Sequence, residues 1–487
     1  MAQYILAHDF GTSGDKASLF TTEGKFVGTR TVGYPTHYQH GTWAEQDPMD
    51  WWKAFCESTR SLLADVDAKD VLCVAFSGTY PNCLCVDKDG EPLYNAMIWQ
   101  DARSYEEAKE ISALLPPAYT KGRPNGILAT DRTLPKLLWI KKHLPEVFEK
   151  TYKVFPSVAD FIVMKLTGNA VVSERIASST AMMNLEKTDW SDEVLSIAGV
   201  PRSMMPDLKA RTDVVGETDD RYTQACGLAA GTKLVIGTGD TICTAIGAGV
   251  LKPGDAFMNG GTSAGIYVEP RPGDGSVGGL TASSGSSFSW LKNTICKYEQ
   301  ELAKQTGRDV YDIINEEIAK APIGSNGVLF HPYLAGERAP RNNPRAKGSF
   351  VGISLTTTRE DILRSVIEGI GFNINVILQG VRDKGYDIQR LAIVGGLGKG
   401  EITRQIFADI MDVELMTFQY MDETATVGAA VLGGIAIGLY EDESAVHKFM
   451  EISAVTKPDP ERHAQYQKIM PLFEAVYEAQ VPLYEQM

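Results

Sequence analysis

Short apolar runs alternate with longer segments of helical periodicity along the whole chain. Near the N-terminus, residues 4–8 form an apolar run that predicts a strand, residues 11–14 contain two glycines that predict a tight turn, and residues 16–20 predict a second strand. Because the turn is short, the two strands are expected to pair as an antiparallel hairpin.

Further along the chain, the same patterns predict helices and buried strands in alternation. Asp47 followed by Pro48 has the form of a helix N-cap with proline in the first helical position, and Gly168 stands where a left-handed C-cap would end a helix. Predicted helices cover residues 48–63, 134–143, 157–166, 358–374 and 402–411, and predicted strands cover residues 71–76 and 391–394. This alternation is typical of an α/β fold with mixed sheets.

The longest stretch that is both uncharged and predominantly apolar, residues 424–440, needs separate consideration as a membrane segment. It has only seventeen residues and contains four glycines, whereas a membrane crossing takes about 20 predominantly apolar residues. We therefore expect a buried helix that packs closely on a neighbour, and no membrane contact.

Composition and charge narrow the class of protein. The chain has 487 residues, of which 44% are apolar and 22% charged, as in an ordinary globular protein. Its net charge of −15 would repel a nucleic-acid backbone, which excludes nucleic acid as a partner. The N-terminus reaches His8 and Asp9 too early for a signal-peptide core, and the seven cysteines are scattered. We expect a cytoplasmic protein and leave a homodimer open.

A tripeptide near the start of the chain recurs near its middle. Gly11-Thr12-Ser13 returns as Gly261-Thr262-Ser263, 250 residues later, and each copy lies between two strand-like runs. Two such turns near the start of two equal halves predict two similar domains that face each other across a cleft. We place the boundary near residue 245, which gives domains of residues 1–245 and 246–487.

The first turn contains groups that could hold a phosphate. Asp9 ends the first strand, the glycines let the backbone approach an anion, and Lys16 supplies a compact cation. Asp9 also stands where a Mg²⁺ ion that bridges phosphate oxygens would need an oxygen ligand. The alternative is a plain hairpin turn, in which glycine and serine serve only the backbone conformation.

A second carboxylate follows a later strand. Asp240 comes after the apolar run 234–236 and a glycine-containing loop, where it could orient an alcohol and accept its proton during phosphoryl transfer. The alternative is an aspartate that caps the next helix. Residues 395–400 resemble a dinucleotide fingerprint with the wrong glycine spacing, and the chain contains no Walker lysine motif.

Together these stretches resemble the FGGY carbohydrate kinases of the actin-like ATPase superfamily, and they look most like the xylulokinase branch. The resemblance covers nearly the entire chain. It is carried by residues of four stretches, which are Asp9, Gly11, Thr12 and Lys16, then residues 41–48, residues 99–103 and residues 332–340.

The resemblance implies two ribonuclease-H-like domains, an ATP and Mg²⁺ requirement, and phosphoryl transfer from MgATP to a sugar or polyol hydroxyl. It implies that Asp240 is the catalytic base and that Asp9 holds the metal. The implied ATP-binding residues are Gly11, Thr12, Ser13, Lys16, Gly261, Thr262, Ser263, Gly395, Gly396 and Lys399. The expected sugar-binding residues are Thr79, Tyr80, Trp99, Asp240 and Thr241.

Departures from the family pattern lie on the sugar side. After Ser77-Gly78, xylulokinases carry Gln-Met-His, whereas this chain continues with Thr79, Tyr80 and Pro81, and Thr241 replaces the usual Asn. The acceptor therefore stays open among ketoses, deoxy sugars, other epimers and short polyols. Two other functional classes also stay open, an actin-like or chaperone-like ATPase and a sugar-sensing module without catalysis.

Overall fold

The structure of the protein is a computed structural model that describes residues 2–487, and its internal contacts divide the chain into two compact units. The first unit contains residues 2–247 and Glu423–Phe449, and the second contains Ala248–Asp422 and Met450–Met487. The expected domain ranges, 1–245 and 246–487, stay a prediction. By packing, the segment Glu423–Phe449 belongs with the first unit.

A six-stranded mixed sheet forms the centre of the first unit, in the order β12-β13-β6-β1-β2-β3. Its strands are β1 (Tyr4–Phe10), β2 (Gly14–Thr21), β3 (Phe26–Gly33), β6 (Val71–Gly78), β12 (Val214–Glu217) and β13 (Lys233–Gly239). Strands β1 and β2 form the predicted antiparallel hairpin, while β6 runs parallel to β1 and β13 runs parallel to β6. The carboxyl ends of β1, β6 and β13 therefore meet at one edge of the sheet.

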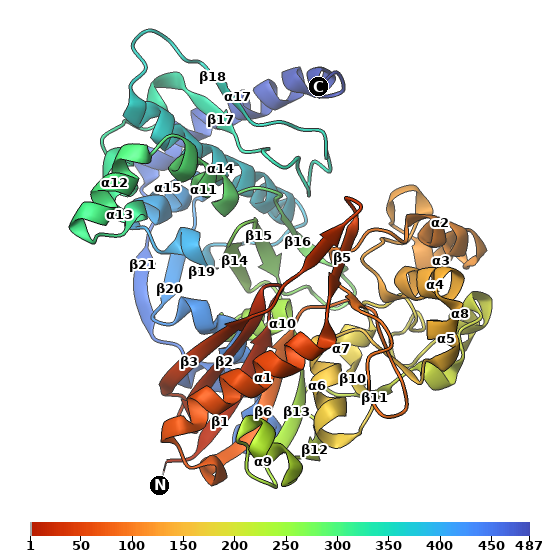
Figure 1. Cartoon of the computed structure of the whole chain (residues 1–487). Coiled ribbons are helices and arrows are strands. Elements are labelled where there is room, and N and C mark those ends of the chain that lie inside the picture. Colours follow the sequence, from red (N-terminus) through yellow and green to blue (C-terminus); the bar gives the residue numbers. More distant parts are fainter. Residues whose placement is uncertain (1) are drawn as a thin grey trace. The chain divides into compact units, whose positions relative to one another are not determined.

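Helices cover both faces of this sheet. Helices α1 (Pro48–Leu62) and α6 (Val158–Thr167) pack on one face, and α10 (Asp240–Gly247) and α16 (Thr424–Ala436) pack on the other. Figure 1 shows α1 lying along β2 and β3. Along β1, Leu6 and Phe10 join the core under α1, while Ile5 lies against Gly433 of α16. This alternation follows from the two-residue period of a strand.

The uncharged stretch 424–440 begins with the expected buried helix. Helix α16 ends at Ala436 and packs on α10 with close backbone contact. A Cβ atom on Gly428 would lie 1.9 Å from the carbonyl oxygen of Cys243, and one on Gly247 would lie 1.8 Å from that of Thr424. Glycine is therefore required on both helices, because any side chain would push them apart. Within residues 2–487, no helix combines the length and apolar character needed to cross a membrane.

The rest of the first unit forms a largely helical lobe with a core of its own. Its helices are α2 (Tyr105–Leu114), α3 (Pro117–Thr120), α4 (Thr133–His143), α5 (Pro145–Lys150), α7 (Glu174–Ala177) and α8 (Asp192–Ala198), and α9 (Arg221–Cys226) lies beside α1. Its short strands are β4 (His37–Gln39), β5 (Trp43–Gln46), β7 (Leu84–Val86), β8 (Ala96–Met97), β9 (Lys153–Phe155), β10 (Val171–Ser173) and β11 (Asp207–Lys209). The predicted caps are confirmed, with Asp47 before α1 and Gly168 at φ 77° after α6.

The second unit repeats the sheet plan of the first. Its six-stranded sheet has the order β16-β15-β14-β19-β20-β21. The strands are β14 (Ala256–Gly260), β15 (Ala264–Val268), β16 (Val277–Leu280), β19 (Arg390–Val394), β20 (Glu414–Phe418) and β21 (Ile452–Thr456), with a separate pair β17 (Leu329–His331) and β18 (Ser349–Val351). An antiparallel meander is followed by two parallel strands and an antiparallel edge strand, as in the first unit.

This repeat places the two Gly-Thr-Ser turns at equivalent points. Residues 11–13 join β1 to β2, and residues 261–263 join β14 to β15. By the same correspondence, the segment after Gly78 of β6 is the counterpart of the segment that begins with Gly395 after β19. The tripeptide echo in the sequence therefore reports a true structural repeat.

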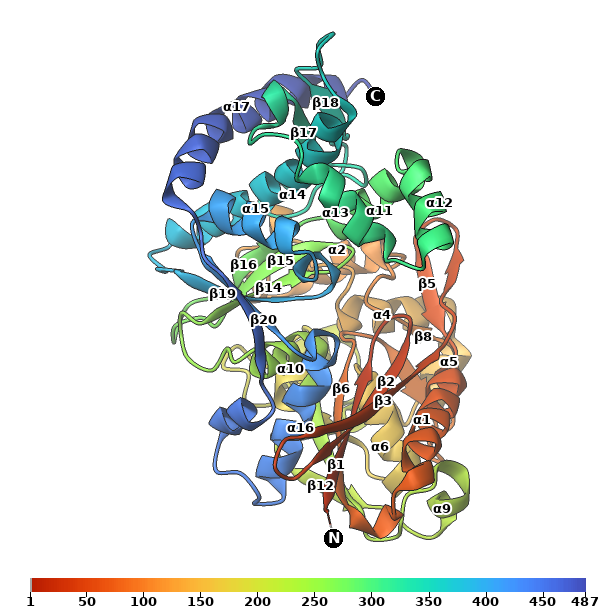
Figure 2. The ribbon, with the colours of Figure 1, turned by 90° about the vertical axis from the view of Figure 1, so that its left-hand side faces the viewer.

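Helices of the second unit are α11 (Gly285–Thr294), α12 (Lys297–Thr306), α13 (Val310–Ile318), α14 (Arg359–Arg382), α15 (Glu401–Met411) and α17 (Pro460–Tyr484). Figure 2 shows α14 and α15 side by side, and both contribute to the apolar core on the sheet. Thr358 caps α14 as predicted, in a capping box with Asp361.

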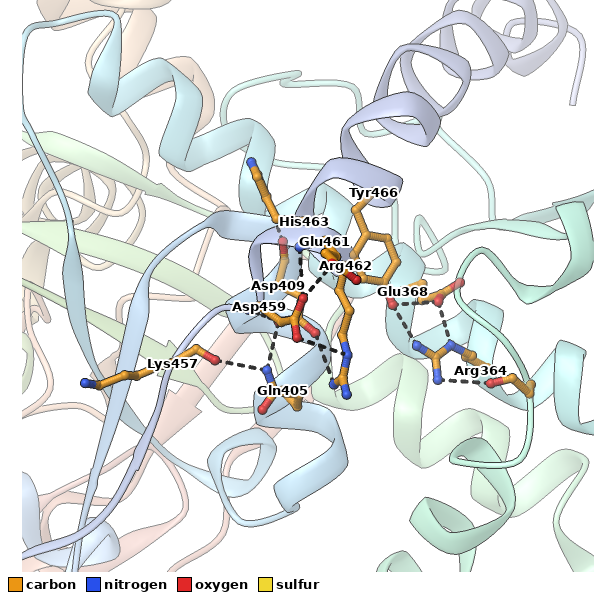
Figure 3. A network of polar contacts seen from close by, with 11 residues as sticks. Arg364, Glu368, Gln405, Asp409, Lys457, Asp459, Glu461, Arg462, His463 and Tyr466 are labelled. Atoms are coloured by element: carbon orange, nitrogen blue, oxygen red, sulfur yellow. Dashed lines mark hydrogen bonds and ion pairs between the residues drawn. The ribbon is translucent and has the colours of Figure 1, made fainter.

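Buried polar contacts fasten the start of the C-terminal helix α17 to α14 and α15, as Figure 3 shows. Glu368 of α14 accepts hydrogen bonds from Arg364 Nε at 2.7 Å and from Tyr466 Oη at 2.8 Å. Asp409 of α15 accepts the backbone N–H of Asp459 at 2.8 Å, and its carbonyl oxygen lies 2.8 Å from Nδ1 of His463. These contacts satisfy two buried carboxylates, which would otherwise be costly to bury.

Candidate functional site

Three polar residues share one register at the carboxyl edge of the first unit's sheet. Asp9 of β1 is opposite Ser77 of β6, and Ser77 is opposite Thr238 of β13. Asp240 follows two residues later and begins α10. The topology therefore brings the two carboxylates that the sequence singled out to neighbouring strand ends.

Asp9 is half-buried, and both positively and negatively charged side chains lie near it. Ser77 Oγ donates a hydrogen bond of 2.7 Å to Asp9 Oδ1, and Lys16 lies directly opposite Asp9 in the hairpin. Burial raises the pKa of Asp9, and the carboxylates of Asp15 and Glu423 add to this effect, while Ser77 and Lys16 oppose it. Because burial and the neighbouring carboxylates make the charged form of Asp9 costly, a cation beside Asp9, in addition to Lys16, would be favourable.

Asp240 is also half-buried, and its carboxylate stays beside the start of its own helix. Its Oδ1 accepts the backbone N–H of Thr241 at 2.6 Å and lies 3.2 Å from Thr241 Oγ1. Burial raises the pKa of Asp240 to about 7, and the negative charge of Asp9 contributes to the rise. A carboxylate with a pKa near neutrality is suited to accept and release a proton.

Protein groups bind all three carbonyl oxygens of the turn at residues 11–13. Tyr34 Oη donates to Gly11 O at 2.6 Å, Gln46 Nε2 donates to Thr12 O at 2.8 Å, and the Tyr34 N–H donates to Ser13 O at 3.2 Å. The side chain of Thr12 also has a partner, because Trp99 Nε1 lies 3.1 Å from Thr12 Oγ1. Because these carbonyls face the protein and the Gly11 N–H donates within the turn to Gly14 O at 2.9 Å, the N–H groups of Thr12 and Ser13 are the ones that the turn can present to an anion.

Tyr80 lies against the backbone that leads to Asp240. A Cβ atom on Gly239 would lie only 1.8 Å from Tyr80 Cε1, so the ring covers this glycine directly. Burial raises the pKa of Tyr80 to about 12, and the charge of Asp240 contributes in the same direction. Thr79 is buried beside it, whereas Thr241 is exposed. The predicted sugar-binding residues Tyr80 and Trp99 thus lie beside Asp240 and Thr12 respectively.

Two of the family-like stretches build the frame of this site. Arg103 pairs with Asp101 at 2.6 Å and with Glu45 at 2.7 Å, and its guanidinium stacks 3.7 Å from the centroid of the Trp43 ring. Asp101 also accepts the backbone N–H of Ala44 at 2.7 Å. These contacts join residues 41–48 to residues 99–103. Because Arg103 covers the Trp43 ring, Trp43 has a structural role, and Trp99 is the tryptophan of these two stretches that contacts the turn at Thr12.

The second unit holds the equivalent turn beside a cavity. Here too protein groups bind the carbonyl oxygens of the turn, since the N–H of Gly285 donates to Gly261 O at 3.1 Å and that of Ser284 donates to Thr262 O at 3.1 Å. Gly395, with φ 89°, packs against Gly260, where a Cβ atom would lie 3.0 Å from the carbonyl carbon and oxygen. Glycines therefore let the turn, α11 and the segment after β19 approach closely.

The cavity has a volume of about 600 Å³, which is sufficient for a nucleotide-sized ligand. Four of the predicted ATP-binding residues line it, namely Gly261, Thr262, Gly396 and Lys399. Lys399 also forms an ion pair of 2.8 Å with Asp422. Ser263 completes the turn.

Sequence reasoning missed the helical wall of this cavity. The missed residues come from or flank α11, α13 and α15 and are Phe288, Ser289, Asp309, Tyr311, Asp312, Asn315, Gly400 and Thr403. Thr403 Oγ1 donates to Asn315 Oδ1 at 2.9 Å, and a Cβ atom on Gly400 would lie 2.7 Å from Asn315 Nδ2. No spacing pattern relates these residues in the sequence, because three separate helices bring them together.

The donor set suits a magnesium ion that arrives with a nucleotide. Among residues 2–487, no three His, Cys, Asp or Glu side chains are grouped as a metal site. Mg²⁺ keeps several waters and commonly takes one or two carboxylates together with substrate phosphates. A half-buried carboxylate such as Asp9, which has a raised pKa, meets this requirement.

Comparisons with known proteins give matches that cover nearly the whole chain. The model of the N-terminal domain of the FGGY family of carbohydrate kinases matches residues 4–247, and the model of its C-terminal domain matches residues 232–437. Gluconokinase from Bacillus subtilis is 28% identical over 490 residues, covering 97% of this chain and 95% of that protein. Xylulose kinase from the same organism is 28% identical over 495 residues, covering 98% and 97%.

Solved structures show the same fold. The crystal structure of gluconate kinase from Lactobacillus acidophilus superposes with a TM-score of 0.87 at 27% identity and covers 100% of both chains. The structure of ligand-bound xylulose kinase from the same organism gives 0.86 at 27% identity and covers 99% of both. The predicted two-domain α/β fold with mixed sheets is therefore confirmed.

Proposed function

Because this chain belongs to the FGGY family of carbohydrate kinases and is an ATP-dependent phosphotransferase, we propose that Asp240 is its general base toward a sugar or polyol hydroxyl. The observation that carries the proposal is the position of Asp240, which lies half-buried at the start of α10, directly after β13 and beside the strand ends that hold Asp9 and Ser77. Burial and the charge of Asp9 raise the pKa of Asp240 to about 7 there. At this pKa the carboxylate is available near neutral pH, yet it is basic enough to take the proton of an alcohol as the O–P bond forms.

The two Gly-Thr-Ser turns are proposed to bind the nucleotide's phosphates. Protein groups bind the carbonyl oxygens of residues 11–13 and of Gly261 and Thr262, so the N–H groups of Thr12 and Ser13, with their equivalents in the second turn, are the proposed anion donors. Lys16 adds a positive charge next to the first turn, and the cavity that includes Gly396 and Lys399 would take the nucleoside. Membership in a kinase family favours phosphoryl transfer over a chaperone-like ATPase or a sensor.

Asp9 would hold Mg²⁺, directly or through water. When bound, the ion supplies neutralising charge to the phosphate oxygens. The protein's own contribution is to hold the carboxylate in place, through the hydrogen bond from Ser77 and the cross-strand Lys16. If Asp9 has this role, Asp9→Asn should raise the Mg²⁺ concentration needed for half-maximal rate.

The acceptor would lie against Thr79, Tyr80, Trp99 and Thr241, near Asp240. The faces of an indole and a phenol ring suit the C–H groups of a polyhydroxylated chain. Relatives named for gluconate and for xylulose make an open-chain sugar acid and a ketopentose the first acceptors to test. The side-chain differences at positions 79, 80 and 241 favour an acceptor other than D-xylulose.

A coupled ADP-release screen tests the proposal. D-Gluconate, pentuloses, hexuloses, deoxy ketoses and short polyols are each supplied with MgATP. We expect one class to raise ADP release well above the acceptor-free rate and to yield a phosphorylated product. ADP release at the same rate with and without every acceptor would contradict the kinase assignment.

Exchange of three of the proposed acceptor-binding residues then tests whether they select the acceptor. The triple variant Thr79→Gln, Tyr80→Met and Thr241→Asn should move the preference toward D-xylulose, because these are the xylulokinase residues at the same positions. An unchanged order of acceptors would place selectivity in other residues.

A further inference from the structure

A lysine with no assigned role is buried beneath the acceptor side of the first unit. Lys136 of α4 is fully buried, and its ammonium donates to three backbone carbonyl oxygens. The acceptors are Pro81 O at 3.0 Å, Ile98 O at 2.7 Å and Asp131 O at 2.9 Å. An ammonium has three N–H donors, so the three carbonyls use all of them.

Each carbonyl belongs to a different segment, and two of the segments carry a proposed acceptor-binding residue. Pro81 follows Tyr80, and Ile98 precedes Trp99. The same segments are linked a second time, because the N–H of Trp99 donates to Asn82 Oδ1 at 3.1 Å. Cys83 and Met97 of the same two segments also exchange backbone hydrogen bonds of 2.9 and 3.1 Å. Lys136 adds to these links a contact with the two residues that directly adjoin Tyr80 and Trp99.

We propose that Lys136 is a positioning residue for the acceptor, which holds Tyr80 and Trp99 at the separation that the sugar requires. The inference rests on the proposed function, because it takes these two side chains as the wall of the acceptor site. Lys136 itself touches backbone, and its effect on the reaction passes through the two aromatic residues. A displacement of about 1 Å at a reacting site can cost on the order of a hundredfold in rate.

Loss of the charge of Lys136 should also weaken acceptor binding at alkaline pH. Burial lowers the pKa of Lys136 to about 8, partly offset by Cys83, Asp131 and Asp101, while Arg132 lowers it further. Asp101 is itself paired with Arg103. Above this pH the neutral amine has two donors for three carbonyls, so one contact is lost and the acceptor site loosens.

Kinetics of matched variants test the proposal. Lys136→Met removes the charge and the donors, and Lys136→Arg keeps a permanent charge. The control is Lys141→Met on the same helix, where Lys141 Nζ likewise donates to two carbonyls, Ala198 O at 3.0 Å and Gly199 O at 2.8 Å. D-Xylulose, D-gluconate and glycerol are used separately as acceptors, and KM is measured for each acceptor and for ATP.

The expected pattern separates positioning from general stability. Lys136→Met should raise the acceptor KM about tenfold or more, because the wall is displaced, while KM for ATP changes less than twofold. Lys141→Met should lower the melting temperature and leave the acceptor KM unchanged. In wild type the acceptor KM should rise above pH 8, and Lys136→Arg should lack that rise. Equal changes in both KM values, or an alkaline rise that persists in Lys136→Arg, would overturn the proposal.

Hydrogen–deuterium exchange gives a readout that needs no acceptor. In Lys136→Met the amides of residues 79–85 and 97–101 should exchange faster than in Lys141→Met at equal distance from each melting temperature. If these amides stay as protected as in wild type, Lys136 does not hold the segments. If they exchange faster but none of the acceptors is phosphorylated by wild type, the proposed acceptor chemistry fails while the positioning role stands.

Discussion

Asp9 lies at the carboxyl end of β1 and Asp240 directly follows β13, two parallel strands that only β6 separates, and the charge of Asp9 helps to raise the pKa of Asp240 to about 7. Two carboxylates near one edge of a sheet are costly unless a cation or a proton relieves them. These are the properties that the proposed metal ligand and the proposed general base require.

Replacement of Asp240 tests the base directly. Asp240→Asn keeps the size of the side chain but cannot accept the proton, so turnover should fall about 10²–10⁴-fold. KM for ATP should stay within twofold, because Asp240 is proposed to act on the acceptor. Asp219→Asn, an exposed position paired with Arg221, serves as the control and should keep wild-type turnover. Full activity in Asp240→Asn would remove Asp240 from this role.

The pH profile reports the interaction between the two carboxylates. The pKa of Asp240 is raised, and its deprotonated form is the active one, so kcat should rise as pH increases through about 7. In Asp9→Asn the like charge is gone, so the midpoint of the residual activity should move to lower pH. Profiles of kcat from pH 5 to 8 for both proteins check this, and an unmoved midpoint would show that the two groups are not coupled.

The contact between Gly239 and Tyr80 can be tested with a double-mutant cycle. Gly239→Ala places a Cβ atom where the Tyr80 ring lies, so the ring must move and the acceptor KM should rise. In Tyr80→Ala the space is free, so adding Gly239→Ala should have little further effect. Gly275→Ala, at a position with open space around it, is the control. Additive effects in the cycle would mean that the two residues act independently.

A substitution that fills the cavity of the second unit should weaken the binding of the nucleotide and leave that of the acceptor unchanged. Gly396 lines the cavity, and a Cβ atom there meets no neighbour within 4 Å, so Gly396→Leu would direct its side chain into free space. KM for ATP should rise by about tenfold or more if the cavity holds the nucleoside, since a ligand of this kind is mostly enclosed by its pocket. Gly275→Leu is the control. An unchanged KM for ATP would place the nucleoside elsewhere.

Local sequence was sufficient for the elements whose signals are short in range. The first hairpin, the caps at Asp47 and Thr358, and the C-cap at Gly168 follow from alternation and from the conformational preferences of single residues. The repeated Gly-Thr-Ser turn could also be read from the chain, because the same turn chemistry is needed wherever this sheet plan begins. The motif order was enough to identify the family.

Tertiary packing determined the features of the site that depend on residues far apart in the sequence. The wall of the cavity combines residues such as Phe288, Asn315 and Thr403 from three helices, and no periodicity links them. The pKa of Asp240 depends on burial and on a charge from a strand more than two hundred residues earlier. Lys136 looks like any helical lysine until the fold brings three carbonyls to its ammonium. Burial and long-range charge exist only in the folded chain, and they convert residues of ordinary type into a site.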